Sequence, residues 1–351
     1  LWPTAPVEYG GGGLSVDYSV VLEEEIDKYG LSLPPYYDSG GRLGGNSIMV
    51  WGTEEQKMHF LPSILKGQVR TWQLLSEPEA GSDLANVKTT ATEDGDDYII
   101  NGQKVYVGSS HGCDYMWTIT CTDSEAPRHQ NLGWFMIPYN APGITVLPMD
   151  LLSSAGESGA GSGVKNVVYF DNVRVPAFNL VGGKNEGWKV ATTHLELEHG
   201  TGGRIARNWL VDRVFDYCKD NNRRGRPLSQ DSDVRDRLID IYIDAEIGRL
   251  FQLRNYWMRH SRVNTTYEGP QASYQRKTSG LRMAHAILDI MGPAALTKDS
   301  ELGAGEGYFE SHQRAAIIAL HPGGTTDIQK VIMARRIGIG REIREQAGAL
   351  A

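Results

Sequence analysis

Cysteine is scarce in this chain: its 351 residues include only Cys113, Cys121 and Cys218. An odd number of cysteines without a CxxC pair predicts neither a disulfide framework nor a zinc site. The sequence therefore indicates a protein of a reducing compartment. We expect it to be cytoplasmic, or to lie in the mitochondrial matrix if the organism is a eukaryote.

Long apolar runs and an excess of positive charge are also missing. No apolar run approaches the roughly 20 residues of a membrane-spanning helix, and the first residues show no export signal. Lys and Arg number 35 against 43 Asp and Glu, which gives a net charge of −8, so a nucleic-acid backbone is not an expected partner. The composition predicts a soluble globular protein of two or three packed units.

Several familiar catalytic motifs are absent or out of place. No G-x-G-x-x-G follows a strand pattern, and neither a GK[ST] phosphate loop nor H-E-x-x-H occurs, so doubly wound dinucleotide binding and a metal site are not predicted. The stretch from Gly108 to Gly112 matches G-x-S-x-G, but no helix pattern follows it. A nucleophile elbow is therefore not favoured.

The order of patterns predicts three domains, at residues 1–71, 72–180 and 181–351. In the first, residues 17–30 predict a helix ending at Gly30, and residues 47–67 predict short helical pieces broken by Gly52 and Pro62. In the second, short β-prone runs alternate with turn residues, and Asn101-Gly102 predicts a hairpin turn. Tight turns without intervening helices favour an antiparallel barrel or sandwich. Its stretch Ser153–Gly163 has the composition of a flexible surface loop.

The third domain predicts several long helices that pack as a bundle. Near its end a Gly-Gly turn precedes Thr325 and Thr326, either of which can cap the next helix. Such a helix start presents unpaired N–H groups to an anion or a polar cofactor edge. An ordinary capped helix explains the same residues, and both interpretations stay open. Likewise the loop "QLLSEPEAGSD" (73–83) predicts either a ligand-binding loop with free N–H groups or a plain acidic turn.

A carboxylate interrupts an apolar stripe early in this domain. The stripe, at helical spacing, consists of Trp188, Ala191, Leu195, Gly202, Ile205 and Trp209. Glu198 lies on the same stripe, and Gly200, Gly202 and Gly203 follow it. A carboxylate buried there costs several kcal/mol unless it is protonated, paired or functional. It therefore indicates a catalytic base; the alternatives are a Glu198–Arg204 pair or a stripe rotated so that Glu198 faces water.

Four stretches in this order resemble the acyl-CoA dehydrogenase family: "SEPEAGSD", "INGQKVYVGSSH", "VYFDNVRVPAFNLVGGKNEGWKV" and "GGTTDIQKVIMARR". The stretches "PVEYGGGGLS" and "GTEEQKMHFLP" resemble the N-terminal region of the same family, whose usual first pair of helices has no counterpart here. The resemblance implies a multidomain α+β fold with a helical N-terminal part, a central antiparallel β-barrel or sandwich, and a C-terminal four-helix bundle.

The resemblance also implies FAD as cofactor. By position, Ser76 would lie on the ring side of the flavin, Ser82 near ribityl or thioester, and Tyr106 where the family usually has a Trp against the isoalloxazine. The full cofactor set implied is Gln73, Leu75, Ser76, Gly81, Ser82, Tyr106, Gly108, Thr325 and Asp327. The acyl thioester would contact Ser82, Glu198, Gly202, Gly323 and Gly324.

The family places its catalytic base at one of two positions. The commoner one, before the Gly-Thr of the late loop, is Gly323 here and cannot act as a base. The other, on an early helix of the bundle in isovaleryl- and long-chain-type members, corresponds to Glu198. The resemblance and the interrupted stripe therefore identify the same residue.

The chain departs from the family at the adenosine end of the cofactor site. Asn221 replaces the Arg that reaches a neighbouring subunit's FAD pyrophosphate, and Arg224 replaces the following Phe. Asp289, Gly292 and Pro293 occupy the positions of the family's Gln-x-x-Gly-Gly. Gly108 replaces the hydroxyl residue near flavin N5.

The resemblance implies α,β-dehydrogenation of an acyl-CoA thioester to the trans-2-enoyl-CoA, with electrons passed to an electron-transfer flavoprotein. A homotetramer or heterotetramer is expected. The altered adenosine end supports an alternative, a structural or half-site subunit of a heteromeric enzyme with impaired FAD binding. A third alternative is a relative that reacts with oxygen as an oxidase.

Overall fold

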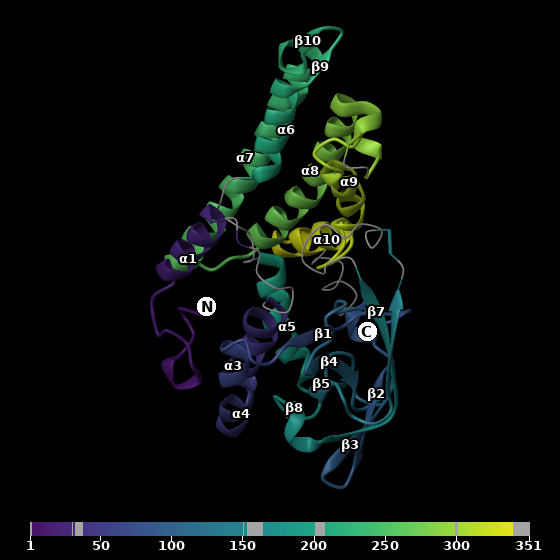
Figure 1. Cartoon of the computed structure of the whole chain (residues 1–351). Coiled ribbons are helices and arrows are strands. Elements are labelled where there is room, and N and C mark those ends of the chain that lie inside the picture. The colour runs from purple at the N-terminus through teal and green to yellow at the C-terminus, as the bar shows by residue number, and fades with distance from the viewer. Residues whose placement is uncertain are drawn as a thin grey trace. The chain divides into compact units, whose positions relative to one another are not determined.

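The computed structural model of the chain describes residues 2–29, 31, 38–149, 151–152, 164–200, 208–298 and 301–339. They fall into two compact units, Leu1–Glu198 and His199–Ala351, each with its own apolar core (Figure 1). The predicted loop 153–163, together with Gly202, Gly203 and Arg204, lies outside the described residues. Within the described ranges, no helix combines the length and apolarity needed to cross a membrane.

The first unit opens with helices, as predicted. They are α1 (Asp17–Lys28), α3 (Asn46–Trp51) and α4 (Glu54–Leu65). Gly52 separates α3 from α4, and Thr53 begins α4 with a reciprocal capping box to Gln56. The predicted break at Pro62 is wrong, because Pro62 lies inside α4. A proline there forfeits one backbone bond, but burial of the neighbouring apolar side chains in the core keeps the last turn helical.

The sheet of the first unit has the strand order β6-β7-β3-β2-β4-β5-β8, with β1 paired to β4. Its strands are β1 (Thr71–Leu74), β2 (Thr90–Asp94), β3 (Asp97–Val107), β4 (Tyr115–Cys121), β5 (Leu132–Pro138), β6 (Ile144–Met149), β7 (Lys165–Pro176) and β8 (Leu180–Val181). Most pairs are antiparallel, as predicted, but β1 and β2 each run parallel to β4. Figure 1 shows α5 (Gly187–Gly200) beside β1, β4 and β5, where Val190 and Ala191 join the cores under the sheet.

The predicted hairpin turn at Asn101-Gly102 is wrong. Strand β3 continues through both residues, and the turn lies earlier, at Gly95-Asp96 between β2 and β3. Gly102 has a φ of +142° and lies so close to Thr89 that a Cβ would meet its Cα at 2.7 Å. Gly102 therefore allows the chain to pass close to Thr89 and lies at an irregular step in the β3–β7 ladder. The Asn-Gly dipeptide does not reverse the chain here.

A bulge near the end of β3 changes which side chains face the core. Lys104 pairs with Val168 and Val107 with Asn166, so β3 contains one residue more than β7 between these pairs. Tyr106 has a φ of +60° there. As a result Lys104 and Val107 are both buried, and the ring of Tyr106 turns outward, 59% exposed.

The second unit is helical, with a small hairpin. Its elements are α6 (Trp209–Asp220), β9 (Asn222–Arg223), β10 (Arg226–Pro227), α7 (Ser232–His260), α8 (Glu268–Met291), α9 (Tyr308–Ile318) and α10 (Thr326–Arg336). Helix α8 packs against α7, α9 and α10, around a core that includes Val214, Ile287 and Phe309. The helical N-terminal part, central sheet and C-terminal helices predicted from the sequence are thus confirmed.

Candidate active site

Glu198, the predicted base, lies in the last turn of α5 and is half-buried. Its Oε2 accepts a hydrogen bond of 3.1 Å from the side-chain amide of Gln73 on β1. The structure therefore brings together two predicted site residues that are 125 positions apart in the chain. An amide donor favours the ionised form of a carboxylate, which is the form a base requires.

The end of α5 is fixed from a second direction. Residues Asp38–Gly45 form a π-helical turn, from which Arg42 donates a 2.7 Å hydrogen bond to the carbonyl of Leu197. A cation suits the carbonyl end of a helix, where backbone acceptors lack helical partners. The turn lies close to the sheet because Gly44 has no Cβ, which would lie 2.7 Å from the indole nitrogen of Trp117. Arg42 thus positions the residue that precedes Glu198.

The buried face of α5 differs from the predicted stripe. Its buried residues include Val190, Ala191 and His194, whereas Trp188 and Leu195 are only partly covered. The His194 ring packs against Trp117, with centroids 4.7 Å apart. His194 was not among the residues predicted from the sequence, although its spacing of four residues from both Val190 and Glu198 is a helical signal.

The loop from Leu75 to Asp83 contains four predicted cofactor residues. Its beginning is anchored to β3, where Val105 N donates to the carbonyl of Ser76 at 2.9 Å. Gly81 and Ser82 are exposed, and a Cβ added to Gly81 would meet no atom within 4 Å. The loop therefore has a fixed base and an open tip, as a ligand-binding loop requires.

The end of β3 and the turn after it contain the other two predicted cofactor residues of this unit, Tyr106 and Gly108. Gly108 has a φ of +60°, and a Cβ there would lie 2.2 Å from the Trp72 ring, so a hydroxyl side chain cannot stand at this position without a shift. Lys165 Nζ donates to the Gly108 carbonyl at 2.8 Å, and burial lowers the pKa of Lys165. Asn166 donates to the carbonyls on both sides of Gly108, which fixes the turn beside the exposed ring of Tyr106.

The remaining predicted residues belong to the second unit. Gly323 and Gly324 have φ values of +63° and +75°, a backbone conformation that favours glycine. Thr325 caps α10, its hydroxyl accepting from Ile328 N at 3.2 Å, so of the two threonines Thr325 is the cap. Gln329 donates at 2.8 Å to the carbonyl of Gly323, and Asp327 is exposed in the first turn.

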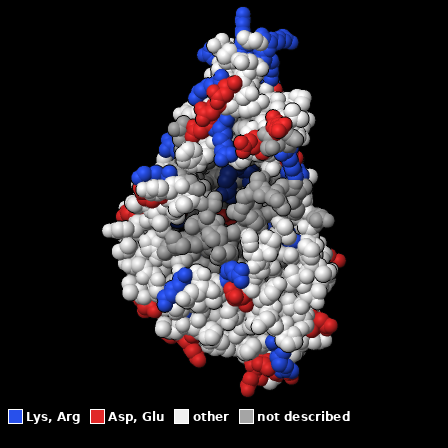
Figure 2. Space-filling view, in the orientation of Figure 1, with Lys and Arg blue, Asp and Glu red and all other residues white. Residues whose placement is uncertain are grey.

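Two residues that differ from the family pattern at the adenosine end, Asn221 and Asp289, bond to other residues of their own unit. Asn221 donates to the carbonyl of Tyr217 at 3.0 Å and so caps its own helix, α6. Asp289 pairs with Arg237 at 2.7 Å. The turn between β9 and β10 presents three exposed arginines, Arg223, Arg224 and Arg226, at the end of this unit where Figure 2 shows Lys and Arg side chains gathered.

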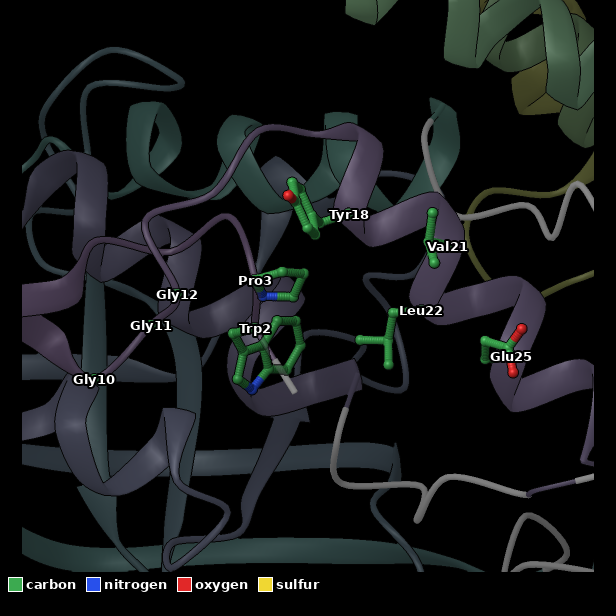
Figure 3. Close-up of a pocket in the computed structure, with 9 residues that line it drawn as sticks. All are labelled: Trp2, Pro3, Gly10, Gly11, Gly12, Tyr18, Val21, Leu22 and Glu25. Atoms are coloured by element: carbon green, nitrogen blue, oxygen red, sulfur yellow. The ribbon is translucent and has the colours of Figure 1, made fainter.

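A pocket of about 580 Å³ lies elsewhere in the first unit. It is lined by Trp2, Pro3, Gly10, Gly11, Gly12, Tyr18, Val21, Leu22 and Glu25, and Figure 3 shows Trp2 and Leu22 extending toward the same space. None of the predicted site residues lines it. Among the described residues, no cluster of His, Cys, Asp or Glu is arranged to hold a metal ion.

Comparison with known sequences gives three matches along the chain. Profiles of the N-terminal, middle and C-terminal domains of acyl-CoA dehydrogenase match residues 1–68, 73–173 and 185–338. Acyl-CoA dehydrogenase IpdE1 of Mycolicibacterium smegmatis is 30% identical over 97% of this chain and 85% of its own length. Acyl-CoA dehydrogenase FadE26 of Mycobacterium tuberculosis is 30% identical over 93% of the chain and 82% of its own length.

Solved structures show the same similarity as the sequence relatives. The ChsE4-ChsE5 complex from Mycobacterium tuberculosis contains a chain that is 28% identical, with a TM-score of 0.84 over 96% of this chain and 86% of that one. The steroid ACAD Tcur3481-Tcur3483 is also 28% identical, with a TM-score of 0.82 over 95% and 83% of the two chains. The three profile matches and the relatives, which agree over nearly the whole length, show that this chain belongs to the acyl-CoA dehydrogenase family of FAD-dependent oxidoreductases.

Proposed function

We propose that the chain catalyses α,β-dehydrogenation of an acyl-CoA thioester to the trans-2-enoyl-CoA, with Glu198 as the catalytic base. The observation that supports this most directly is the half-buried carboxylate of Glu198 at the end of α5, bonded to the Gln73 amide at 3.1 Å. At Gly323, the alternative base position, there is no side chain to take a proton.

The residues of the first unit fit a flat aromatic cofactor. The open tip at Gly81 leaves backbone surface free for a ligand. The ring of Tyr106, exposed where β3 bulges, gives an aromatic surface near the end of that strand. In the first unit, the residues that would hold the flavin end of FAD are Gln73, Leu75, Ser76, Gly81, Ser82, Tyr106 and Gly108. Thr325 and Asp327 of the second unit are proposed as cofactor contacts from the family resemblance alone.

FAD, when bound, supplies the acceptor for the β-hydride. The chain's own residues do the acid–base work: Glu198 removes the α-proton, and the Gln73 amide keeps its carboxylate oriented and ionised. Hydrogen bonds to the thioester carbonyl lower the cost of the enolate-like charge that develops as the proton leaves. In the first unit, Ser82 would border the acyl thioester.

The test is substrate-driven bleaching of the flavin. The purified chain, loaded with FAD and kept anaerobic, is mixed with a panel of straight, branched and ring-bearing acyl-CoA thioesters. Loss of the flavin band with at least one thioester, together with the enoyl product, supports the proposal. A flavin that binds but bleaches with none of them contradicts it, and peroxide release in air would instead indicate an oxidase.

We propose branched or ring-bearing acyl groups as the substrate class. Gly323 lacks the side chain of the commoner base position, and Gly200, Gly202 and Gly203 follow Glu198 in the sequence. Missing side chains leave volume near the reacting carbons, and a packed site is sensitive to every methylene. The similarity to the solved structure of the steroid ACAD Tcur3481-Tcur3483 supports this choice.

Assembly with a second acyl-CoA dehydrogenase chain is part of this proposal, with an electron-transfer flavoprotein as the electron acceptor. Helix α7 exposes an apolar face made of Ile239, Tyr242, Ile243, Ile247, Leu250 and Trp257. Contiguous exposed apolar side chains of this kind mark protein interfaces. The similar structure of the ChsE4-ChsE5 complex contains two different chains, so both a homotetramer and a heterotetramer fit.

The second candidate function is a structural or half-site subunit of a heteromeric enzyme. Its support is that Asn221 caps its own helix and Asp289 pairs with Arg237, so neither side chain is arranged as the family's adenosine-end residues would be. The absorption spectrum of the chain purified alone separates the candidates. A stoichiometric flavin band supports the complete enzyme, and a colourless protein that cannot be loaded with FAD supports the half-site subunit.

A further inference from the structure

A lysine is buried in the core of the sheet beneath the loop Leu75–Thr89. Lys104 lies on the inner face of β3 among Tyr98, Ile100 and Val107. Its Nζ is 2.7 Å from Oε1 of Glu77, and the two side chains are only 0% and 4% exposed. Glu77 belongs to the stretch "SEPEAGSD" and Lys104 to "INGQKVYVGSSH", but neither residue was predicted to have a role in the site.

The pair is hydrogen-bonded to four other residues of the chain. Lys104 Nζ donates to the carbonyls of Ile119 at 2.8 Å and Leu75 at 3.2 Å. Glu77 accepts from the backbone N–H of Lys88 and, at 3.1 Å, of Thr89. Both ends of the loop are therefore tied to one buried ion pair, which is itself anchored to β3 and β4.

Burying this pair removes two charges from water, which opposes folding. Burial lowers the pKa of Lys104 to about 8, against the opposing attraction of Glu77. Burial also disfavours the charge on Glu77, but Lys104 and the backbone donors outweigh it and hold the pKa of Glu77 below its usual value. Well-packed apolar side chains often stabilise a core as well as or better than a buried ion pair. Stability alone therefore does not explain these two residues.

The opposite side of the loop faces outward. Within it, Glu77 and Ala80 exchange backbone hydrogen bonds of 3.0 and 3.2 Å and are both buried. The residues between and after them, Pro78, Glu79, Gly81, Ser82 and Asp83, are exposed. The tip has open space in front of it, whereas the base is held by charge-assisted bonds, the stronger kind. A rigid base beneath an accessible tip is how a loop is preorganised for a ligand.

We propose that Glu77 and Lys104 are positioning residues for the cofactor, setting the backbone of Leu75–Thr89 so that its tip is ready for the flavin before FAD binds. This rests on the proposed function, in which Ser76, Gly81 and Ser82 contact FAD. The pair acts through the loop and touches neither cofactor nor substrate.

The experiment compares Glu77→Gln, Lys104→Met and the double variant. Each single variant leaves one buried charge without its partner, which is strongly destabilising, whereas the double variant removes both charges. The matched control is Glu93→Gln/Lys184→Met, which removes an exposed ion pair of the same sheet, 3.0 Å long. The readouts are thermal unfolding of the apoprotein, the FAD dissociation constant and the shape of the flavin absorption band.

We expect the double variant to recover most of the thermal stability that the single variants lose, while its FAD dissociation constant stays at least tenfold above wild type with an altered flavin band. The exposed control pair should leave all three readouts unchanged. A double variant with restored stability and an FAD affinity within twofold of wild type would show that the pair is structural only.

Hydrogen exchange of the wild-type chain gives a second test that needs no variant. In the apoprotein the amides of Lys88 and Thr89 should already be protected, because Glu77 accepts from both. If they exchange freely until FAD is added, the loop is not preset and the proposal is wrong. A wild-type chain that binds no FAD would contradict the proposed function instead, so the two failures are distinguishable.

Discussion

The side-chain amide of Gln73, on β1, donates a 3.1 Å hydrogen bond to the carboxylate of Glu198, at the end of α5. Gln73 was expected to line the cofactor, and the structure gives it a contact with the residue proposed as the base. One residue can serve both, because a glutamine side chain has an amide group that donates and an oxygen that accepts. The hydrogen bond thus links the segment predicted to hold FAD to the residue predicted to move the proton.

Replacing Glu198 by glutamine should remove substrate-driven bleaching while the fold and bound FAD are retained. The change preserves shape but removes the proton acceptor, which is worth roughly 10²- to 10⁴-fold in rate. Anaerobic stopped-flow mixing with an active thioester measures it. Glu196→Gln, an exposed change on the same helix, is the control and should behave as wild type. A Glu198→Gln protein that keeps most of its activity means that the base is another residue.

Gln73→Met should slow proton abstraction, because the variant loses the donor that orients the Glu198 carboxylate. A hydrogen bond to a charged group contributes roughly 1.5–3 kcal/mol, so we expect about a 10- to 100-fold lower rate of substrate-driven flavin bleaching. Gln68→Met, at an exposed position, controls for the substitution itself. An unchanged bleaching rate would argue that the Gln73 contact is incidental.

Asn221→Arg should tighten FAD binding if the pyrophosphate contact of the family has been lost in this chain. A charge-assisted bond to phosphate contributes roughly 1.5–3 kcal/mol, so the dissociation constant should fall by about tenfold or more in titrations of the assembled apoprotein.

No change in affinity would mean that an arginine of the β9–β10 turn already fills the role. Arg223 donates to the carbonyl of Ile290, which leaves Arg224, at the tip of the turn with a φ of +53°, as the residue to replace next. Asn222→Arg, one position along, serves as the matched control for added charge.

Glu77 should make the stability of the first unit depend on acid pH. Its folded pKa lies below the usual 4.5, so its stabilising effect is fully present above about pH 4.5 and is lost as pH falls through the folded pKa. Thermal unfolding of the apoprotein between pH 3 and pH 7 should show this loss in the wild type. In the Glu77→Gln/Lys104→Met variant that component of the slope should be absent. Equal slopes in both proteins would show that other carboxylates govern acid unfolding.

Branched or ring-bearing thioesters should be turned over at least as well as short straight ones. The reason is the absence of a side chain at Gly323 and the glycines that follow Glu198, which leave volume near the α and β carbons. The comparison is kcat/KM for butyryl-CoA against a branched and a cyclic thioester under the same conditions. A preference for butyryl-CoA of tenfold or more would contradict the expectation, and would mean that neighbouring side chains refill the space.

The sequence was informative wherever one local pattern was sufficient. Helical patterns and a closing glycine predicted α1 and the several long helices of the second unit, and the Gly-Gly turn limited the cap of α10 to Thr325 or Thr326, of which the structure selects Thr325. The Asn101-Gly102 error arose because the same dipeptide suits a hairpin and a close approach between strands, and only the pairing with β7 decides between them. Lys104 was missed for a related reason: a lysine on a strand is usually exposed, and its partner Glu77 lies 27 residues away. For Glu198, helical spacing pointed to a constrained carboxylate, but nothing local could identify Gln73 as its partner.

The bulge before Val107 has a consequence for comparing this chain with its relatives. Before the bulge, the buried residues of β3 are the even-numbered Tyr98, Ile100 and Lys104. After the extra residue, the odd-numbered Val107 is the one that faces the core. The inward-facing positions of β3 therefore change from even-numbered to odd-numbered residues at the bulge. A substitution at an even-numbered position affects the core before the bulge and the surface after it. Deleting Val105 would restore the regular ladder and leave Tyr106 alone between the inward-facing Lys104 and Val107, so its ring would still face outward but without the positive φ of the bulge. The residue proposed to lie against the flavin would then be held in an ordinary extended conformation.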